Sequence, residues 1–234
     1  MLLVFDDRPS TSPLIERVWR SRSDGAGRFS SIASPLWEMV VTRVRGTTVM
    51  TVRGPETRAT AADCPADGEW LGIRFKFGTF MPHIPVAHVL DRNDVDLPHV
   101  SPGAFWLDGC AWEYPSWDNA EVFVQRLLQR GLIGHDRIVD AALHGREELS
   151  TRSTERRFLR ATGLTRGAHR QIERARHVTQ LLQSGAAIAD AAHDAGYFDQ
   201  AHLTRSVKHL IGQTPGQIAR GETQLSFLYK TDAA

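Results

Sequence analysis

The first part of the chain contains short runs in which β-branched and aromatic residues partly alternate with polar ones. Three such runs lie at residues 39–44, 47–52 and 71–77, with glycines between them. Half-buried strands have this two-residue period, and the glycines favour turns. Prolines 82, 85, 98 and 102 follow too densely for helices, and we expect the sheet to end there. The pattern predicts a β-rich sandwich or barrel domain over residues 1–117.

After Asp118 the apolar residues adopt a helical period. Asp118 is the expected N-cap, and one face of the first helix holds Phe123, Val124, Leu127 and Leu128. Further helices are expected at residues 136–143, 150–162, 166–183, 186–194 and 199–211. The fold class is therefore predicted to be α+β. A linker helix at 118–134 joins the β-rich domain to an all-α domain at 135–222, and a tail follows at 223–234.

The all-α part contains an internal repeat. Residues 156–167 align without a gap with residues 205–216, forty-nine positions further on. In each copy a helix follows a good N-cap, Ser150 or Asp199, and ends at a glycine suited to the left-handed conformation, Gly163 or Gly212. The second copy also has a preceding helix and a glycine turn. Helix, glycine-containing turn and helix form the DNA-binding helix-turn-helix pattern.

The two repeated helices have matching apolar faces. These faces carry Thr154, Phe158 and Ala161 in the first copy, and Leu203, Val207 and Leu210 in the second. Residues near the N-terminus of a recognition helix read base edges, whereas other cations hold phosphates. The predicted base contacts are Arg152, Arg156, Gln200, Thr204 and Arg205. The predicted phosphate contacts are Arg157, Arg160 and Lys208.

The net charge of +1 hides a strong local imbalance. Residues 150–176 contain eight arginines and two acidic residues, a balance of +6, whereas residues 84–123 have a balance of −6. The positive charge is thus concentrated on the repeated helical unit, where a nucleic acid is expected to bind. A solvated charged face, or a surface that binds protein, is the alternative interpretation.

Other chemistry is weakly indicated. The chain has two cysteines, Cys64 and Cys110, which cannot form a disulfide framework or a four-cysteine zinc site. We interpret both as small buried residues. Redox sensing at Cys110 is the alternative. His83, His88 and His99 lack an acidic partner with ligand spacing, so no metal or cofactor is predicted. The aromatic residues between 105 and 117 fit either a core or an effector pocket. Without a signal peptide or a long apolar run, we expect a cytoplasmic protein with no membrane partner.

Residues 195–215 resemble the second helix-turn-helix of the AraC/XylS transcription regulators. The shared features are the Gly196-Tyr197 turn, a helix with Arg205 and Lys208, and the terminal Gly-x-Thr-Pro. Residues 150–165 are similar to the first recognition helix of that family. The stretch before Ser150 leaves little room for the helix and glycine turn that usually precede it, and Thr154 stands where leucine is usual.

The resemblance covers about residues 135–222 and implies a specific function. Two recognition helices, at about 150–162 and 199–211, would occupy adjacent major-groove segments about 34 Å apart on one side of double-stranded DNA. In that family an additional N-terminal domain is usually a cupin-like β barrel that binds an effector or mediates dimerisation. The expected partners are therefore duplex DNA, with RNA polymerase, a small-molecule effector and a second copy of the chain as further candidates.

The rival hypothesis is an enzyme, DNA-modifying or cupin-type, that uses the helical domain for targeting. The DNA-alkylation repair proteins with a similar domain use a four-cysteine zinc centre, which two cysteines cannot supply. A cupin-type enzyme would need metal ligands. We therefore predict a non-enzymatic, sequence-specific transcription regulator.

Overall fold

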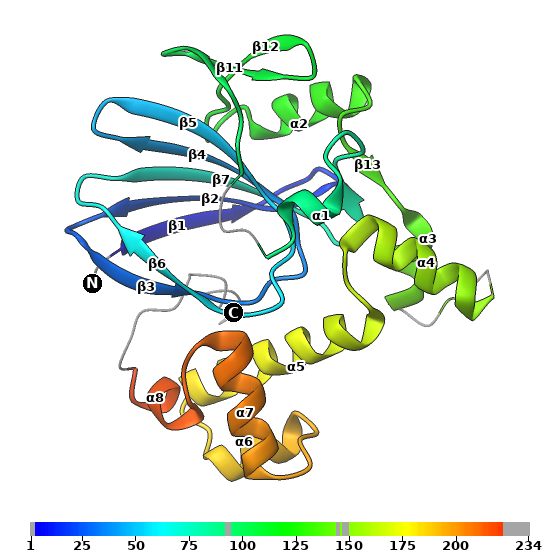
Figure 1. Cartoon of the computed structure of the whole chain (residues 1–234). Helices are drawn as coiled ribbons and strands as arrows, with labels where there is room; N and C mark the ends of the chain where they lie inside the picture. Colours follow the sequence, from blue (N-terminus) through cyan, green and yellow to red (C-terminus); the bar gives the residue numbers. More distant parts are fainter. Residues whose placement is uncertain (1–2, 92–94, 144–145, 147–149, 222–234) are drawn as a thin grey trace.

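The computed structural model describes residues 3–91, 95–143, 146 and 150–221. Strands dominate up to residue 113 and helices dominate from residue 120 (Figure 1). This order confirms the predicted α+β class. We refer to residues 3–135 as the β region and to residues 136–221 as the helical region. The tail predicted at 223–234 lies outside the described residues.

The β region is built on an open, antiparallel six-stranded sheet with the order β1-β2-β7-β4-β5-β9. The predicted runs at 39–44, 47–52 and 71–77 form its centre, because β7 pairs with β4 and β4 pairs with β5. The strands of this sheet are β1 (Leu3–Pro9), β2 (Ile15–Ser23), β4 (Glu38–Val44), β5 (Thr47–Arg53), β7 (Glu69–Phe75) and β9 (Val95–Asp96).

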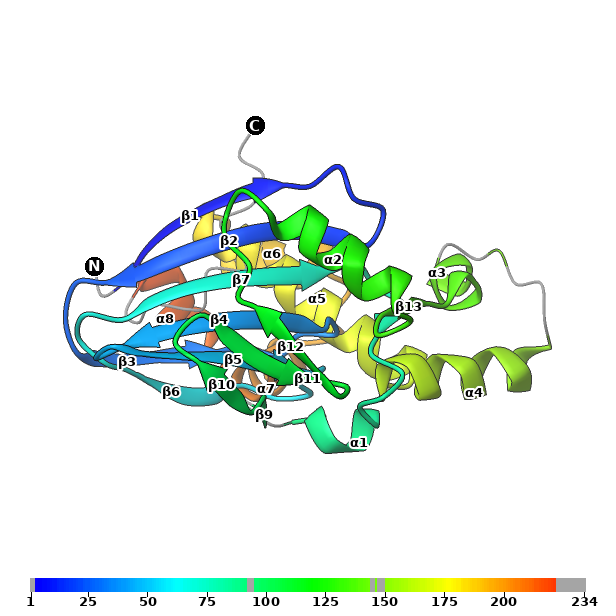
Figure 2. The ribbon, with the colours of Figure 1, turned by 90° about the horizontal axis from the view of Figure 1, so that it is seen from above.

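Each face of this sheet is covered by different elements. Helix α2 and a small three-stranded sheet lie over one face, and the β3–β6 pair and the helical region lie on the other (Figures 1 and 2). Two further strands, β8 and β13, pair with each other in an antiparallel arrangement. The bounds are β3 (Gly27–Ser31), β6 (Thr60–Cys64), β8 (Thr79–Phe80), α1 (Val86–Val89), β10 (His99–Ser101), β11 (Ala104–Leu107), β12 (Cys110–Glu113), α2 (Ala120–Gln129) and β13 (Gly134–His135).

The expectation that strands end at the proline-rich stretch is wrong. Strands β9 to β12 lie within or beyond it. Pro98 and Pro102 each stand next to an end of β10, where a missing backbone N–H does not interrupt the ladder. Two aromatic residues of this part belong to the core, because Phe105 and Trp112 are buried and their rings contact Phe123 of α2. Trp106 is instead 44% exposed.

Helix α2 begins differently from the prediction. Its N-cap is Asn119 rather than Asp118, and the Asn119 side chain accepts a hydrogen bond from the Ser116 N–H (2.7 Å). Glu121 accepts hydrogen bonds from Arg8 (2.6 and 2.9 Å), which lower its pKa to about 2. Of the four residues predicted on the apolar face, Phe123, Val124 and Leu127 are buried in the core, whereas Leu128 is 37% exposed.

The helical region contains the predicted helices. Helix α6 begins two residues later than predicted, and α8 follows the Thr214 cap. None of the helices within the described residues is long and apolar enough to span a membrane. The helices are α3 (Arg137–Leu143), α4 (Thr151–Thr162), α5 (Arg166–Gln183), α6 (Ile188–Asp194), α7 (Gln200–Ile211) and α8 (Pro215–Arg220).

The two regions share apolar contacts. The core of the helical region includes Ile32 and Ala33 from the segment after β3, and Phe77 and Leu90 pack against it. Figure 2 shows α3 and α4 beyond one end of the sheet, whereas α5, α6, α7 and α8 lie beneath it. The β region therefore forms part of the surface on which the helices pack.

Candidate nucleic-acid interface

Helices α4 and α7 have the same length and the same type of caps. Each contains twelve residues. The Ser150 side chain accepts a hydrogen bond from the Ser153 N–H (3.4 Å), and Asp199 accepts one from the His202 N–H (2.6 Å). Gly163 and Gly212 end the helices with φ of 70° and 84°, a conformation that favours glycine. The caps expected from the repeat are therefore confirmed.

The apolar faces of these helices are buried as predicted. Phe158 of α4 and the equivalent Val207 of α7 are both 0% exposed. Because one face of each helix packs inward, the opposite face is left for solvent or a ligand. The other predicted core residues, all buried, are Thr154, Ala161, Leu203 and Leu210.

The predicted contacts on α7 share one surface. Gln200, Arg205 and Lys208 are exposed, and neither cation forms an ion pair within the part of the chain that the structure describes. Thr204 is partly buried, and its hydroxyl donates to the Gln200 carbonyl (2.8 Å). That hydroxyl oxygen can still accept a hydrogen bond. The side chains at the N-terminal half of α7 are thus available for a base edge.

The four predicted arginines of α4 divide into two groups. Arg152, Arg156 and Arg160 are exposed and make no ion pair with any described residue. The Arg157 guanidinium instead forms an ion pair with Asp136, the residue before α3, with 3.2 Å between a guanidinium nitrogen and a carboxylate oxygen. A phosphate that binds Arg157 therefore has to compete with this carboxylate.

A basic groove of about 550 Å³ runs beside α4. Arg156, Arg157 and Arg160 line it, together with Phe80 of β8 and Asp136. Sequence reasoning missed Phe80 and Asp136 because no local pattern connects them with α4. The groove brings three of the predicted DNA contacts together at one place.

Ion pairs reduce the basic charge of residues 150–176. Three of the eight arginines have carboxylate partners: Arg157 with Asp136, Arg166 with Glu155 (2.6 Å), and Arg176 with Glu173 (3.2 Å). The other five have no carboxylate partner among the described residues, and they are Arg152, Arg156, Arg160, Arg170 and Arg174. The unpaired charge thus remains concentrated on α4 and on the exposed side of α5.

The C-terminal ends of α4 and α7 both lie against the β region. At α7, the Ala33 N–H donates to the Leu210 carbonyl (2.8 Å) and the Ala59 N–H donates to the His209 carbonyl (2.9 Å). These carbonyls belong to the last turn, where no partner exists within the helix. At α4, the side chain of Val86 lies next to Gly163. The N-terminal ends of both helices point away from the β region (Figure 1).

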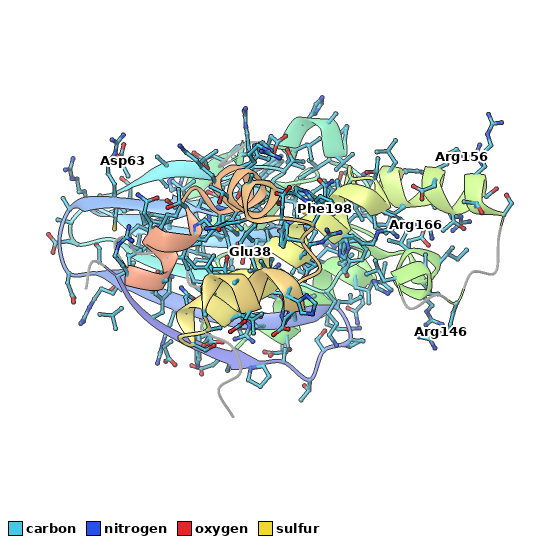
Figure 3. The ribbon with its side chains drawn as sticks, turned by 90° about the horizontal axis from the view of Figure 1, so that it is seen from below. Glu38, Asp63, Arg146, Arg156, Arg166 and Phe198 are labelled. Atoms are coloured by element: carbon cyan, nitrogen blue, oxygen red, sulfur yellow. The ribbon has the colours of Figure 1, made fainter. Side chains whose placement is uncertain are left out.

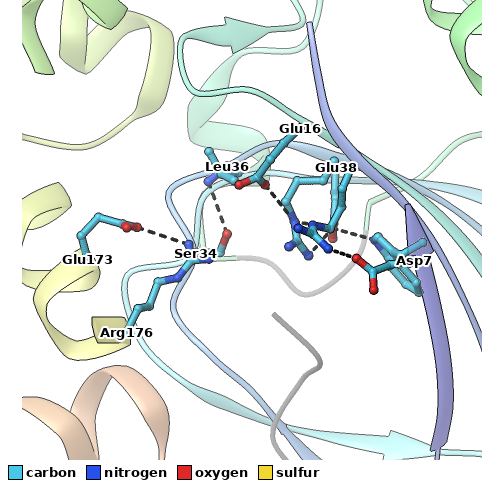
Figure 4. A network of polar contacts seen from close by, with 10 residues as sticks. Asp7, Glu16, Ser34, Leu36, Glu38, Glu173 and Arg176 are labelled. Carbon is cyan, nitrogen blue, oxygen red and sulfur yellow. Dashed lines mark hydrogen bonds and ion pairs between the residues drawn. The ribbon is translucent and has the colours of Figure 1, made fainter. Parts of the chain in front are cut away.

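Figure 4 shows a cluster of polar side chains in the sheet and, to one side of it, Glu173 and Arg176 of α5. Buried Arg74 donates two hydrogen bonds to Glu38 (2.7 and 2.8 Å), and Glu38 also accepts one from the Trp19 indole (2.9 Å). Burial raises the pKa of Glu16, and Arg74 and then Arg176 of α5 oppose this rise. Arg176, which also pairs with Glu173 (3.2 Å), thus places a positive charge of α5 near the carboxylate of Glu16 on β2.

Another contact fixes the turn before α7. The Arg174 guanidinium lies 5.4 Å from the centre of the Tyr197 ring and donates a long hydrogen bond to the Gly196 carbonyl (3.4 Å). Sequence reasoning counted Arg174 only as a basic residue. Its position shows that one part of the arginine cluster stabilises the helix-turn-helix itself.

Comparison with known proteins supports the geometry of the helical region. The family model described as a helix-turn-helix domain matches residues 145–221, about a third of the chain. No curated protein and no solved structure gives a significant match. Within the described residues, no group of three or more His, Cys, Asp or Glu side chains is placed to hold a metal ion. The match and the geometry thus identify a helix-turn-helix domain of the AraC type within residues 145–221, a type of domain that binds DNA.

Proposed function

We propose that the chain regulates transcription by binding a specific duplex sequence with α4 and α7 in adjacent major-groove segments. The observation that carries this proposal is the matched pair of capped twelve-residue helices, each with its N-terminal end directed away from the β region. Recognition helices use their N-terminal residues to contact bases. Two such helices in one chain can contact two neighbouring segments of one duplex.

The roles of the individual residues follow from their positions. Arg152, Arg156, Gln200, Thr204 and Arg205 contact base edges in this proposal, because they lie on the exposed side of α4 or α7 nearer to the N-terminus. Arg160 and Lys208 lie near the C-terminal ends and hold phosphates. Arg157 contributes a weaker phosphate contact, because it must leave Asp136 to make one.

The predicted domain 1–117, which makes up most of the β region, is proposed to bind an effector or to dimerise. A cavity of about 240 Å³ between the six-stranded sheet and the β3–β6 pair supports the effector role. An effector bound there would change the fluorescence of the lining residues Trp19 and Trp70. Dimerisation through the β region and contact with RNA polymerase rest on the family resemblance alone.

The decisive test selects binding sites for the full chain from a random duplex library. The proposal expects a winner with two half-sites about 10 base pairs apart, bound at least about 10³-fold more tightly than a scrambled duplex. Weak binding that is independent of sequence and lost at moderate salt would contradict it, because such binding needs only phosphate contacts.

Variants of α7 then test the separate roles. Arg205→Ala is expected to cost about 1–3 kcal/mol and to relax preference at one base position, whereas Lys208→Ala weakens all duplexes alike and reduces the salt slope by about 1. Arg43→Ala is the matched control, since Arg43 is an exposed cation on β4. Equal, sequence-independent losses in Arg205→Ala and Lys208→Ala would contradict the assigned roles.

A further inference from the structure

Phe198 is an exposed aromatic residue at the start of the second recognition helix. Its side chain is 93% exposed, against 62% for Val122, the next most exposed large apolar residue described. It lies in the loop between α6 and α7, immediately before the N-cap Asp199 (Figure 3). Covering an exposed phenyl ring is favourable, so the position of this ring at the start of a recognition helix makes it suited to contact a partner.

The local sequence offers Phe198 a partner that it does not use. An apolar residue before the N-cap often packs against the fourth residue of the helix, which here is Leu203. Leu203 is completely buried, but Phe198 remains in solvent. The neighbouring Tyr197 packs inward instead, with its hydroxyl 3.1 Å from that of Ser206. The turn is thus anchored by Tyr197, and Phe198 points outward.

The backbone around Phe198 is held on both sides. Before it, the Tyr197 N–H donates to the Ala192 carbonyl (2.9 Å), and Arg174 contacts both Gly196 and the Tyr197 ring. After it, the Asp199 side chain caps α7. These contacts fix the position from which the ring extends, so little entropy is lost when it binds.

We propose that Phe198 packs against the 5-methyl group of a thymine in the α7 half of the binding site. This inference rests on the proposed function, in which the N-terminal end of α7 enters the major groove. The thymine methyl is the apolar group that bases present in that groove, and a phenyl ring is suited to contact it. Phe198 directly precedes Asp199 and Gln200, so its contact would lie beside the base edge that Gln200 reads.

The test replaces each thymine of the selected duplex by deoxyuridine, one at a time, which removes only the methyl group. For the unaltered full chain, one replacement in the α7 half is expected to weaken binding about three- to tenfold. Phe198→Ala is expected to weaken binding of the original duplex by a similar factor and to be insensitive to that replacement. Such non-additivity is the signature of a direct contact.

Leu159→Ala is the matched control, because Leu159 is an apolar residue of α4 that is 51% exposed. It should retain the thymine dependence in full. A thymine dependence that survives in Phe198→Ala, or a selected site without thymine in the α7 half, would overturn this inference alone. Normal DNA binding by Phe198→Ala with a changed oligomeric state would also overturn it, because the ring would then contact protein. Absence of specific binding by the unaltered chain would instead overturn the proposed function.

Discussion

The two repeated units share a backbone design but differ in the chemistry of their cores. The forty-nine-residue offset places Thr154, Thr162 and His169 of the first unit where the second has Leu203, Ile211 and Ile218. All six side chains are buried. The Thr154 hydroxyl and the His169 Nδ1 have no hydrogen-bond partner within the described part of the chain. The first unit therefore buries polar groups at positions where the second buries only hydrocarbon.

The two units also differ in how they contact the β region. The Phe158 ring of α4 lies 5.3 Å from that of Phe77, and the His169 ring lies 4.5 Å from the same phenyl group. Helix α7 instead packs mainly on α5, α6 and α8 and uses the β region to satisfy its last carbonyls. The second unit is thus largely complete within the helical region, whereas the first borrows an aromatic residue from the β region.

The largest effect that breaks this comparison is expected from Phe158→Ala. Loss of a buried phenyl group costs about 3–5 kcal/mol, and here it also removes the contact with Phe77. All six tryptophans lie in the β region, so their fluorescence reports unfolding of that region, and far-ultraviolet circular dichroism reports the helices. Phe158→Ala should shift both urea transitions. Val207→Ala, at the equivalent position of the second unit, should shift mainly the helical one.

An unchanged fluorescence transition in Phe158→Ala would show that α4 and the β region unfold independently. The dependence of the first unit on Phe77 would then be wrong. Equal shifts of both transitions in both variants would mean that the whole chain unfolds as one cooperative unit, and the contrast between the two units would disappear.

The glycines that end α4 and α7 provide a test of intermediate size. All three of Gly163, Gly212 and Gly131 have positive φ, so alanine costs about 1–2 kcal/mol at each. A Cβ at Gly163 would lie 2.8 Å from Val86, and one at Gly212 would lie 3.1 Å from Ala59, whereas none of the described atoms lies within 4 Å at Gly131. Crowding adds about 1–3 kcal/mol where neighbours cannot move.

Thermal unfolding should therefore rank Gly163→Ala as the most destabilising, then Gly212→Ala, then Gly131→Ala, the control without crowding. Site selection with the first two variants adds a functional readout. If the β region holds the recognition helices through these two contacts, Gly163→Ala and Gly212→Ala should relax the preferred spacing between half-sites. Three equal destabilisations would show that neither helix end presses on the β region.

The sequence predicted the repeated units well because their signals are local. The side chains of Ser150 and Asp199 cap the helices by accepting a hydrogen bond from the backbone N–H three residues further on. Gly163 and Gly212 end the helices because their own backbone adopts a positive φ. The apolar period located every predicted core position of α4 and α7. Signals of this kind do not depend on the rest of the chain.

Features that depend on distant residues were missed. Strands β1 and β2 carry many charged residues and so look polar in the sequence. Their charges are neutralised by ion pairs between the two strands, such as Arg20 with Asp6, which form only when the strands pair. The partner of Arg157 is Asp136, and nothing near Arg157 in sequence indicates it. Likewise the exposure of Phe198 follows from the inward position of Tyr197, and two adjacent aromatic residues do not indicate which one is buried.

The smallest expected effect is a change in pH dependence caused by His169. Burial lowers the pKa of His169, and the nearby Arg176 and Arg170 also lower it, against the opposing charge of Glu173. The folded chain therefore keeps this imidazole neutral where the unfolded chain already binds a proton. The stabilisation that the neutral His169 contributes to the free energy of unfolding is therefore fully present above a pH of about 6.5, the ordinary histidine value. It decreases as the pH falls below that value.

His169→Ile, which copies Ile218 of the second unit, should remove this part of the pH dependence. The free energy of unfolding, measured by urea titration between about pH 5 and 8, should fall less steeply toward acid in the variant than in the unaltered chain. His177→Ile is the control, because His177 is an exposed residue of the same helix. Identical slopes for the unaltered chain and His169→Ile would show that His169 is protonated alike in both states. In that case the polar core of the first unit would not distinguish it from the second in its response to pH.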